Sequence, residues 1–121
     1  MAYVNGLLAP LHRDQLDAYR RVSEVFAKAA MANGALSICE SVGDGMEWGA
    51  ATSFPRAVDL KDGEVVIFSW ILYPSKEVAD QANDKVMGDP AVQQAMSAVA
   101  LDGKRMVWGG FETLMLDGVS A

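Results

Sequence analysis

Apolar residues alternate in some stretches of the chain and recur every three or four residues in others, which predicts a mixed α+β fold. Alternating segments predict strands over residues 3–10, 35–42, 64–73 and 105–116, with a weaker strand over 54–61. Segments of helical period predict helices over residues 15–32, 76–87 and 90–99. The first helix has an apolar stripe that includes Tyr19 and Phe26, and Asp14 and Ser75 are residue types that cap helix N-termini.

The segment from Glu64 to Tyr73 is apolar on both of its alternating faces. A strand with this pattern needs packing layers on both sides of its sheet. Asp62-Gly63 precedes it and is a strong hairpin signal, so we expect the weak strand over 54–61 to pair back on it. Pro55 would place that weak strand at an edge of the sheet.

The predicted order β-α-β-(β)-β-α-α-β fits a ferredoxin-like antiparallel sheet with helices on one face. In that arrangement the other face of the sheet is bare. The last strand presents apolar side chains on both faces, with Trp108 on one and Phe111 on the other. Because large exposed apolar surfaces usually mark interfaces, we predict that two copies close face to face into a dimeric α+β barrel.

Length and composition fit a single ferredoxin-like domain over residues 1–121, with a frayed tail at 117–121. The net charge of −6 argues against a nucleic-acid partner, since phosphate binding needs clustered basic residues. The N-terminal segment does not have the features of a signal peptide, and no apolar run reaches the roughly 18 residues of a membrane span. We therefore expect a cytoplasmic protein that binds neither nucleic acid nor membrane.

The residues present do not favour a metal site or a catalytic nucleophile. His12 is the only histidine and Cys39 the only cysteine, so one chain cannot build a zinc site of the usual nitrogen and sulfur ligands. Glu40, Asp44 and Glu47 could form a carboxylate site, but a solvated loop is the preferred interpretation. Cys39 is interpreted as a buried, inert thiol, because it has no candidate base beside it. With no glycine-rich phosphate loop in the sequence, we predict no metal and no cofactor.

Polar residues on otherwise apolar strands are the remaining candidates for a site. The candidate catalytic residues are Glu40 and Glu112, and the candidate substrate-binding residues are Tyr3, Asn5, Ser69, Tyr73 and Trp108. If these side chains share one lumen, they would place carboxylates among aromatic rings, which is typical of a small-molecule site. Desolvation would then raise the pKa of a carboxyl group into a range suited to proton transfer. Alternatively, Asn5, Ser69 and Glu112 hydrogen-bond across the dimer interface.

Two adjacent glycines, Gly109-Gly110, interrupt the pattern of the last strand. Glycine inside a strand marks either a bulge or a close approach of another group to the backbone. We expect that group to come from a partner chain or a ligand.

Several spaced motifs resemble one known family. They are Tyr3-Val4-Asn5-Gly6, the run 65–71 with Tyr73-Pro74-Ser75-Lys76-Glu77, Asn83 with Asp89-Pro90, residues 102–106, and Gly109-Gly110-Phe111-Glu112. Together they cover nearly the whole chain and resemble the bacterial family of domain of unknown function 1428, the YbaA-like proteins. The resemblance implies a dimeric α+β barrel and no known activity. Residues 43–53 depart from the acidic pair and the turn that relatives carry there, so a function that depends on this loop does not carry over.

Two functions are consistent with these observations. The first is an enzyme or binding protein that holds a small apolar or aromatic metabolite in a barrel pocket, where Glu40 or Glu112 abstracts a proton. The second is a non-catalytic dimeric interaction or stress-related protein whose barrel interior is filled by aromatic rings. A polar-lined cavity would favour the first function, and a solidly packed interior would favour the second.

Overall fold

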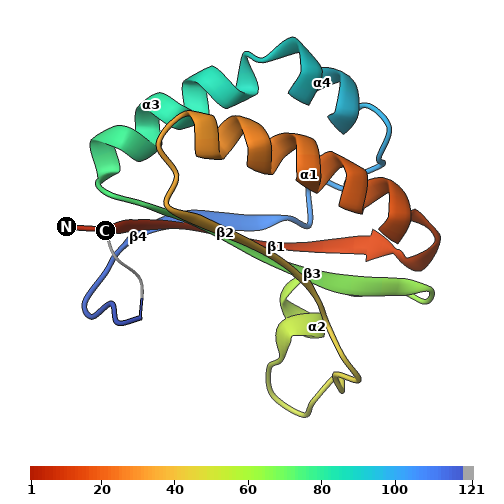
Figure 1. The fold of residues 1–121 in the computed structure, drawn as a ribbon. Coiled ribbons are helices and arrows are strands. Elements are labelled where there is room, and N and C mark those ends of the chain that lie inside the picture. The colour runs from red at the N-terminus through yellow and green to blue at the C-terminus, as the bar shows by residue number, and fades with distance from the viewer. Residues whose placement is uncertain (119–121) are drawn as a thin grey trace.

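The computed structural model of the chain describes residues 1–118. Over these residues, four strands form one antiparallel sheet in the order β2-β3-β1-β4. The strands are β1 (Tyr3–His12), β2 (Ser37–Val42), β3 (Glu64–Tyr73) and β4 (Val107–Glu112). The helices α1 (Leu16–Ala32), α3 (Lys76–Met87) and α4 (Pro90–Met96) cover one face of the sheet, and the short helix α2 (Phe54–Ala57) lies on the other side (Figure 1). The predicted ferredoxin-like sheet with helices on one face is confirmed, and the sheet stays open.

The core lies between the sheet and the three helices that cover it. One part packs Ile71 and Tyr73 of β3 against small apolar residues of α3. The other part packs Ile67 of β3 against Tyr19 and Val22 of α1. Odd-numbered residues of β3 therefore face the helices, because side chains alternate along a strand.

Local signals predicted several element boundaries correctly. β3 has the predicted bounds, and Ser75 caps α3 by accepting a hydrogen bond from the Val78 backbone N–H at 3.2 Å. β4 and α4 are shorter than predicted. β4 ends at Glu112 because that residue pairs with Tyr3, the first residue of β1, so β1 offers no further partner.

The predicted strand over residues 54–61 is wrong. Residues 54–57 form the helix α2, which Ser53 caps by accepting a hydrogen bond from the Arg56 backbone N–H at 3.1 Å. Pro55 fits the first turn of a helix, where no intrahelical partner exists for the N–H that proline lacks. The turn at Asp62-Gly63 does lead into β3, but it follows α2 and is not the tip of a hairpin.

The predicted cap at Asp14 is also wrong. A 3-10 turn (Arg13–Gln15) precedes α1, and the Asp14 backbone N–H donates to Nδ1 of His12 at 3.2 Å. Gln15 is the N-cap residue of α1 and makes no capping hydrogen bond with its side chain. The 3-10 turn forms before α1, and the imidazole of His12 caps this turn by accepting the hydrogen bond from Asp14.

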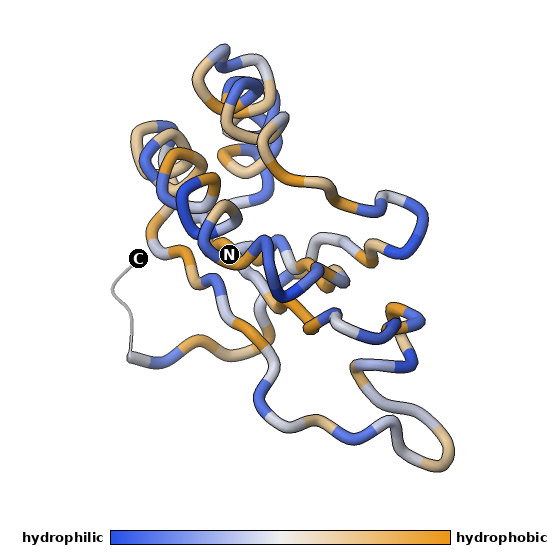
Figure 2. Tube along the Cα trace, turned by 90° about the vertical axis from the view of Figure 1, so that its right-hand side faces the viewer, coloured by the Kyte–Doolittle hydropathy of each residue, from blue (hydrophilic) through white to orange (hydrophobic). Residues whose placement is uncertain are grey.

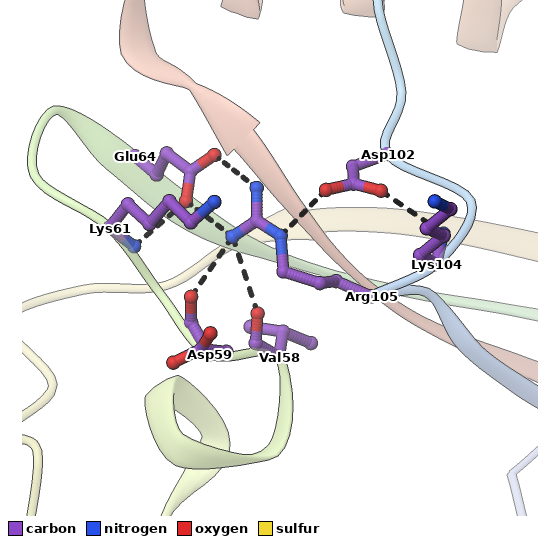
Figure 3. A network of polar contacts seen from close by, with 7 residues as sticks. All are labelled: Val58, Asp59, Lys61, Glu64, Asp102, Lys104 and Arg105. Carbon is purple, nitrogen blue, oxygen red and sulfur yellow. Dashed lines mark hydrogen bonds and ion pairs between the residues drawn. The ribbon is translucent and has the colours of Figure 1, made fainter.

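A largely buried ion-pair network holds the segment before β4 in place (Figure 3). The Arg105 guanidinium donates to both carboxylate oxygens of Glu64, at 2.7 and 2.8 Å, and to Asp102 at 2.8 Å. It also donates to the backbone carbonyl of Asp59 at 3.0 Å. The side chains of Arg105 and Glu64 are only 15% and 13% exposed. The network thus joins the turn after α2, the start of β3 and the approach to β4.

The face of the sheet opposite the helices is rich in apolar side chains and is open in one chain. Phe68 of β3 and Phe111 of β4 lie on it and are 43% and 60% exposed. Figure 2 shows the helices gathered on one side of the sheet, with the path to the C-terminus on the other. The predicted two-sided apolar character of β3 is therefore confirmed.

Residues 113–118 follow β4 and form neither helix nor strand. The predicted fraying of residues 117–121 falls partly on 119–121, which lie outside the described residues. In the described part of the chain, no helix has the length and apolar character that crossing a membrane requires.

Candidate functional site

A groove of about 510 Å³ lies between α1 and the edge strand β2, on the helix-covered side of the sheet. Side chains of α1 form one wall, side chains of β2 form the other, and Ile67 of β3 contributes to the floor. Ser23 and Ala27 lie on the same stripe of α1, and their small side chains leave space beside β2. The volume falls within the range of about 300–1,000 Å³ that small-molecule sites occupy.

Glu40 projects into this groove and accepts hydrogen bonds on both carboxylate oxygens. The Tyr19 hydroxyl donates to Oε2 at 2.6 Å, and the Ser69 hydroxyl donates to Oε1 at 2.9 Å. Glu40 and Ser69 are direct cross-strand partners on β2 and β3, whereas Tyr19 reaches Glu40 from α1. An ionised carboxylate offers about four acceptor positions, so Glu40 can still accept hydrogen bonds from a ligand.

Burial changes the proton affinities of this cluster. It raises the pKa of Glu40 because the carboxylate loses solvation, and the hydrogen bonds from Tyr19 and Ser69 offset part of this increase. The pKa of Tyr19 is also raised, first by burial and then by the adjacent Glu40 charge. Tyr19 therefore remains a neutral hydrogen-bond donor at physiological pH, and Glu40 is a stronger base than a solvated carboxylate.

Charged residues of α1 form the rim of the groove. They are Asp17, Arg20 and Glu24. Together with Glu40 they give three carboxylates against one guanidinium. This balance disfavours an anionic ligand and favours a neutral or cationic one.

The predicted polar residues all belong to the helix-covered side of the sheet. In the strand register, Glu40 pairs with Ser69, Ser69 pairs with Leu7, and Leu7 pairs with Trp108. Directly paired residues share a face, so these side chains point away from the space that a partner sheet would enclose. The groove lies between the sheet and a helix, rather than in a lumen between two sheets.

The structure brings together two of the predicted residues, Glu40 and Ser69, and separates the others from them. Glu112 and Trp108 lie on β4, at the opposite edge of the sheet and roughly 14 Å or more from β2. Both side chains are exposed, and Trp108 is 77% exposed. The two candidate carboxylates therefore do not share one site.

The three remaining candidates, Tyr3, Asn5 and Tyr73, lie on the central strands β1 and β3. The Asn5 amide donates to Oδ1 of Asn83 on α3, at the long distance of 3.5 Å. Tyr73 is fully buried, and its hydroxyl has no hydrogen-bond partner among the described residues. Tyr3 pairs with Tyr73 across the two strands.

The glycine pair in β4 makes room for a residue of the same chain. A Cβ atom at Gly110 would lie 2.6 Å from Cζ of Tyr3, whereas a Cβ atom at Gly109 would meet no atom of the described residues within 4 Å. The pairing of β4 with β1 runs without a bulge from Val107 to Glu112. The predicted close approach is therefore present, but Tyr3 of the same chain makes it, so the expectation that the group comes from a partner chain or a ligand is wrong.

Replacing Tyr73 with phenylalanine is expected to raise the free energy of unfolding by about 1 kcal/mol. The variant removes a buried hydroxyl that makes no hydrogen bond within residues 1–118 and keeps the shape of the ring. Urea denaturation monitored by circular dichroism measures the change. A loss of stability would show instead that this hydroxyl has a partner in solution.

Within residues 1–118, no group of three or more histidine, cysteine, aspartate or glutamate side chains is placed to hold a metal ion. The carboxylate of Glu40 is directed to Tyr19 and Ser69. Asp44 and Glu47 are exposed residues of the segment after β2.

Tyr19 is the residue of the groove that the sequence did not reveal as a candidate. Its spacing places it in the apolar stripe of α1, and periodicity says nothing about the role of its hydroxyl. One usable signal exists, because Tyr19 and Glu40 both carry polar groups at positions that face the core. Buried polar groups need partners, so two such residues are candidates to pair.

The fold belongs to the ferredoxin-like α+β class. It is shared by a dimeric ferredoxin-like protein from an uncultured marine organism, with 12% sequence identity, a TM-score of 0.55, and coverage of 95% of this chain and 97% of that one. It is also shared by SnoaB, a cofactor-independent oxygenase from Streptomyces nogalater, with 12% identity, a TM-score of 0.53, and coverage of 96% and 95%. At these identities, the likeness establishes the fold alone.

Sequence similarity then defines the family. Residues 2–103 match the family described as "Protein of unknown function (DUF1428)". The chain is 42% identical over 115 residues to the uncharacterized protein YbaA of Escherichia coli K12, covering 95% of this chain and 98% of that protein. The chain belongs to this family, which confirms the resemblance of its motifs.

Proposed function

We propose that this protein binds a small, partly apolar molecule in the groove between α1 and β2, and that Glu40 accepts a hydrogen bond from it. The observation that carries the proposal is a half-buried carboxylate held by Tyr19 and Ser69 at the surface of a groove of ligand size. Apolar side chains such as Leu16, and Ile38 of β2, supply contact surface around it. The negative rim favours a ligand whose donor group is neutral or cationic, such as a hydroxyl or an amine.

Glu40 is also the residue that we propose as a general base. In its ionised form it would take a proton from a hydroxyl or an acidic C–H group of the ligand, becoming a carboxylic acid and leaving an anion. A base is most effective when its pKa lies close to the working pH, and burial raises the pKa of Glu40 in that direction. SnoaB, which shares the fold, is described as a cofactor-independent oxygenase, and a protein-derived base is compatible with chemistry that needs no cofactor.

Phenol and tyramine are expected to bind the groove, and benzoate is not. Binding should shift the backbone amide signals of Ile38, Val42 and Ile67 in 1H–15N NMR spectra. Glu40→Gln should weaken tyramine binding about tenfold, because a charged acceptor is replaced by a neutral one. Affinity for tyramine should rise with pH as Glu40 ionises through its raised pKa.

The matched control for this test is Glu112→Gln, which removes the other candidate carboxylate at the far edge of the sheet. It should leave tyramine binding unchanged. Signal shifts that cluster around β4, or equal binding by the Glu40→Gln variant, would contradict the proposed site.

We also propose that the protein is a homodimer that buries the open face of the sheet. Phe68, Val107 and Phe111 are exposed there in one chain, and a second sheet placed face to face would cover them. The ferredoxin-like neighbour from a marine organism is described as dimeric, which supports a dimer for this fold. A monomer mass in sedimentation velocity at micromolar concentration would contradict it.

One observation favours the non-catalytic alternative. The aromatic rings of Phe68, Trp70 and Phe111 lie on the open face, where they would fill the space between two sheets. In this alternative the hydrogen bonds among Tyr19, Glu40 and Ser69 serve only to hold α1 to the sheet. Absence of binding by phenol and by tyramine would then favour a purely structural role.

A further inference from the structure

Two apolar segments project on the open side of the sheet, at opposite ends of its strands (Figure 1). We call residues 113–118 the tail and residues 43–58 the loop. The tail follows Glu112, which pairs with Tyr3 at the end of the sheet where β3 finishes. The loop follows Val42, which pairs with Ile67 close to the start of β3. The two segments are therefore separated by roughly 20 Å along the strands.

The tail is anchored at its first residue and apolar beyond it. The backbone N–H and the hydroxyl of Thr113 both donate to the Ala2 carbonyl, at 3.2 and 3.0 Å. Leu114, Met115 and Leu116 follow and are 102%, 81% and 39% exposed. Removing large apolar side chains from water is favourable, so three consecutive exposed ones indicate a surface that a partner covers.

The loop has a defined shape and presents apolar side chains of its own. The Arg56 guanidinium donates to the carbonyls of Trp48 and Gly49, at 3.0 and 2.7 Å, and lies 5.0 Å from the centre of the Trp48 ring. Phe54 contacts Phe68 of the open face, with ring centroids 6.3 Å apart. Apolar surface is exposed on Met46, Trp48 and Phe54.

Symmetry relates the two segments once a second copy covers the open face. The loop follows the edge strand β2 and the tail follows the opposite edge strand β4, so the two segments lie at diagonally opposite corners of the open face. A two-fold axis that lies between the two sheets and runs obliquely to their strands exchanges both the strand ends and the sheet edges, and it brings the loop corner of one copy to the tail corner of the other. Because a two-fold interface is self-complementary, the same contact then forms twice.

The area available is sufficient for a stable dimer. The exposed large apolar residues of the open face, loop and tail are Met46, Trp48, Phe54, Phe68, Val107, Phe111, Leu114, Met115 and Leu116. They present on the order of 1,000 Å² of apolar surface, against roughly 800 Å² per partner in a standard stable interface. The tail supplies a large share of this area, so a dimer that left it in water would lose much of its apolar contact.

We propose that, in the dimer, residues 114–116 of each copy dock on the aromatic surface of the loop of the other copy, formed by Trp48 and Phe54. The occupant of the loop surface is thus a second copy of this chain. The inference rests on the proposed homodimer and adds the pairing of tail with loop. It gives the loop a role in dimer recognition.

Disulfide trapping tests the pairing directly. In a Cys39→Ser background, which removes the only native cysteine, F54C and M115C variants are prepared separately, mixed and oxidised. The mixture should yield a covalent F54C–M115C dimer in larger amount than either variant oxidised alone. Lys28→Cys, placed on the exposed side of α1, is the control and should not link to M115C. Replacing Leu114, Met115 and Leu116 together with serine should weaken dimerisation on the order of 100-fold.

The outcomes separate this inference from the dimer on which it rests. A dimer mass with abundant F54C–F54C and M115C–M115C links, but no mixed link, would overturn the tail–loop pairing and leave the dimer intact. A monomer mass would overturn both. A link between F54C and M115C within one chain of a double variant, at monomer mass, would show that the tail covers its own loop and would also overturn the pairing.

Discussion

Replacing Arg105 with methionine is expected to lower the free energy of unfolding by about 3 kcal/mol at pH 7. Removing one partner of a buried ion pair leaves the other charge uncompensated, and Glu64 would lose both hydrogen bonds from Arg105. The variant would also lose the hydrogen bond from Arg105 to the Asp59 carbonyl, which joins the segment before β4 to the turn after α2 (Figure 3). Urea denaturation followed by tryptophan fluorescence measures the loss.

The matched control is Lys76→Met. Lys76 forms an ion pair with Asp80 at 3.2 Å, but both side chains are at least 60% exposed. An exposed pair of this spacing on a helix is screened by solvent and contributes little to stability, so this variant should be nearly as stable as the wild type. Equal effects of the two substitutions would show that the Arg105 network does not hold the fold together.

The contribution of this network should disappear in acid. Hydrogen bonds from Arg105 lower the pKa of Glu64 from its ordinary value of 4.5 to about 2. A carboxyl group with a lowered folded-state pKa stabilises the fold fully above its unfolded-state pKa, and this stabilisation is lost as pH falls through the folded-state pKa. The stability gap between wild type and Arg105→Met should therefore be constant above pH 5 and shrink between pH 4.5 and pH 2. A gap that stays unchanged down to pH 2 would contradict this account.

Replacing Gly110 with alanine is expected to lower the free energy of unfolding by about 2 kcal/mol. The added Cβ atom would lie 2.6 and 2.7 Å from Cζ and Cε2 of Tyr3, so the tyrosine ring must leave its position over β4. Forcing an atom into occupied space costs about 1–3 kcal/mol, although alanine by itself favours a strand over glycine. Thermal and urea unfolding measure the change.

Gly109 provides the matched control for this prediction. A Cβ atom at Gly109 meets no atom of residues 1–118 of its own chain within 4 Å, so Gly109→Ala should be neutral or slightly stabilising. In a Tyr3→Ala background, Gly110→Ala should lose its penalty, giving a coupling energy of about 2 kcal/mol in the double-mutant cycle. A penalty that persists without the Tyr3 ring would place its cause elsewhere.

Local signals in the sequence predicted the elements that are governed by neighbouring residues. The two-sided apolar run gave the bounds of β3, and Ser75 marked the start of α3. The same signals failed where the local sequence is compatible with both a strand and a helix. Pro55 suits both an edge strand and the first turn of a helix, and the capping hydrogen bond from Arg56 to Ser53 favours the helix.

The groove could be predicted only in part. The sequence indicated Glu40 and Ser69 as polar residues on apolar strands, and the register makes them cross-strand partners. The same criterion also indicated Glu112 and Trp108, which the strand order places at the opposite edge of the sheet. Strand order depends on which strands pair across the whole chain, and alternation within one strand carries no information about it.

The sequence by itself thus determined the class of fold, most helix and strand positions, the apolar character of both faces of β3, and membership of the family. These follow from hydrophobic periodicity and from residue preferences that act within a few positions. Only the tertiary structure decided that Tyr19 meets Glu40, that Arg105 meets Glu64 and that Tyr3 covers Gly110. Each of these contacts joins residues at least 21 positions apart, and their partners are chosen by the packing of helices on the sheet and by strand order.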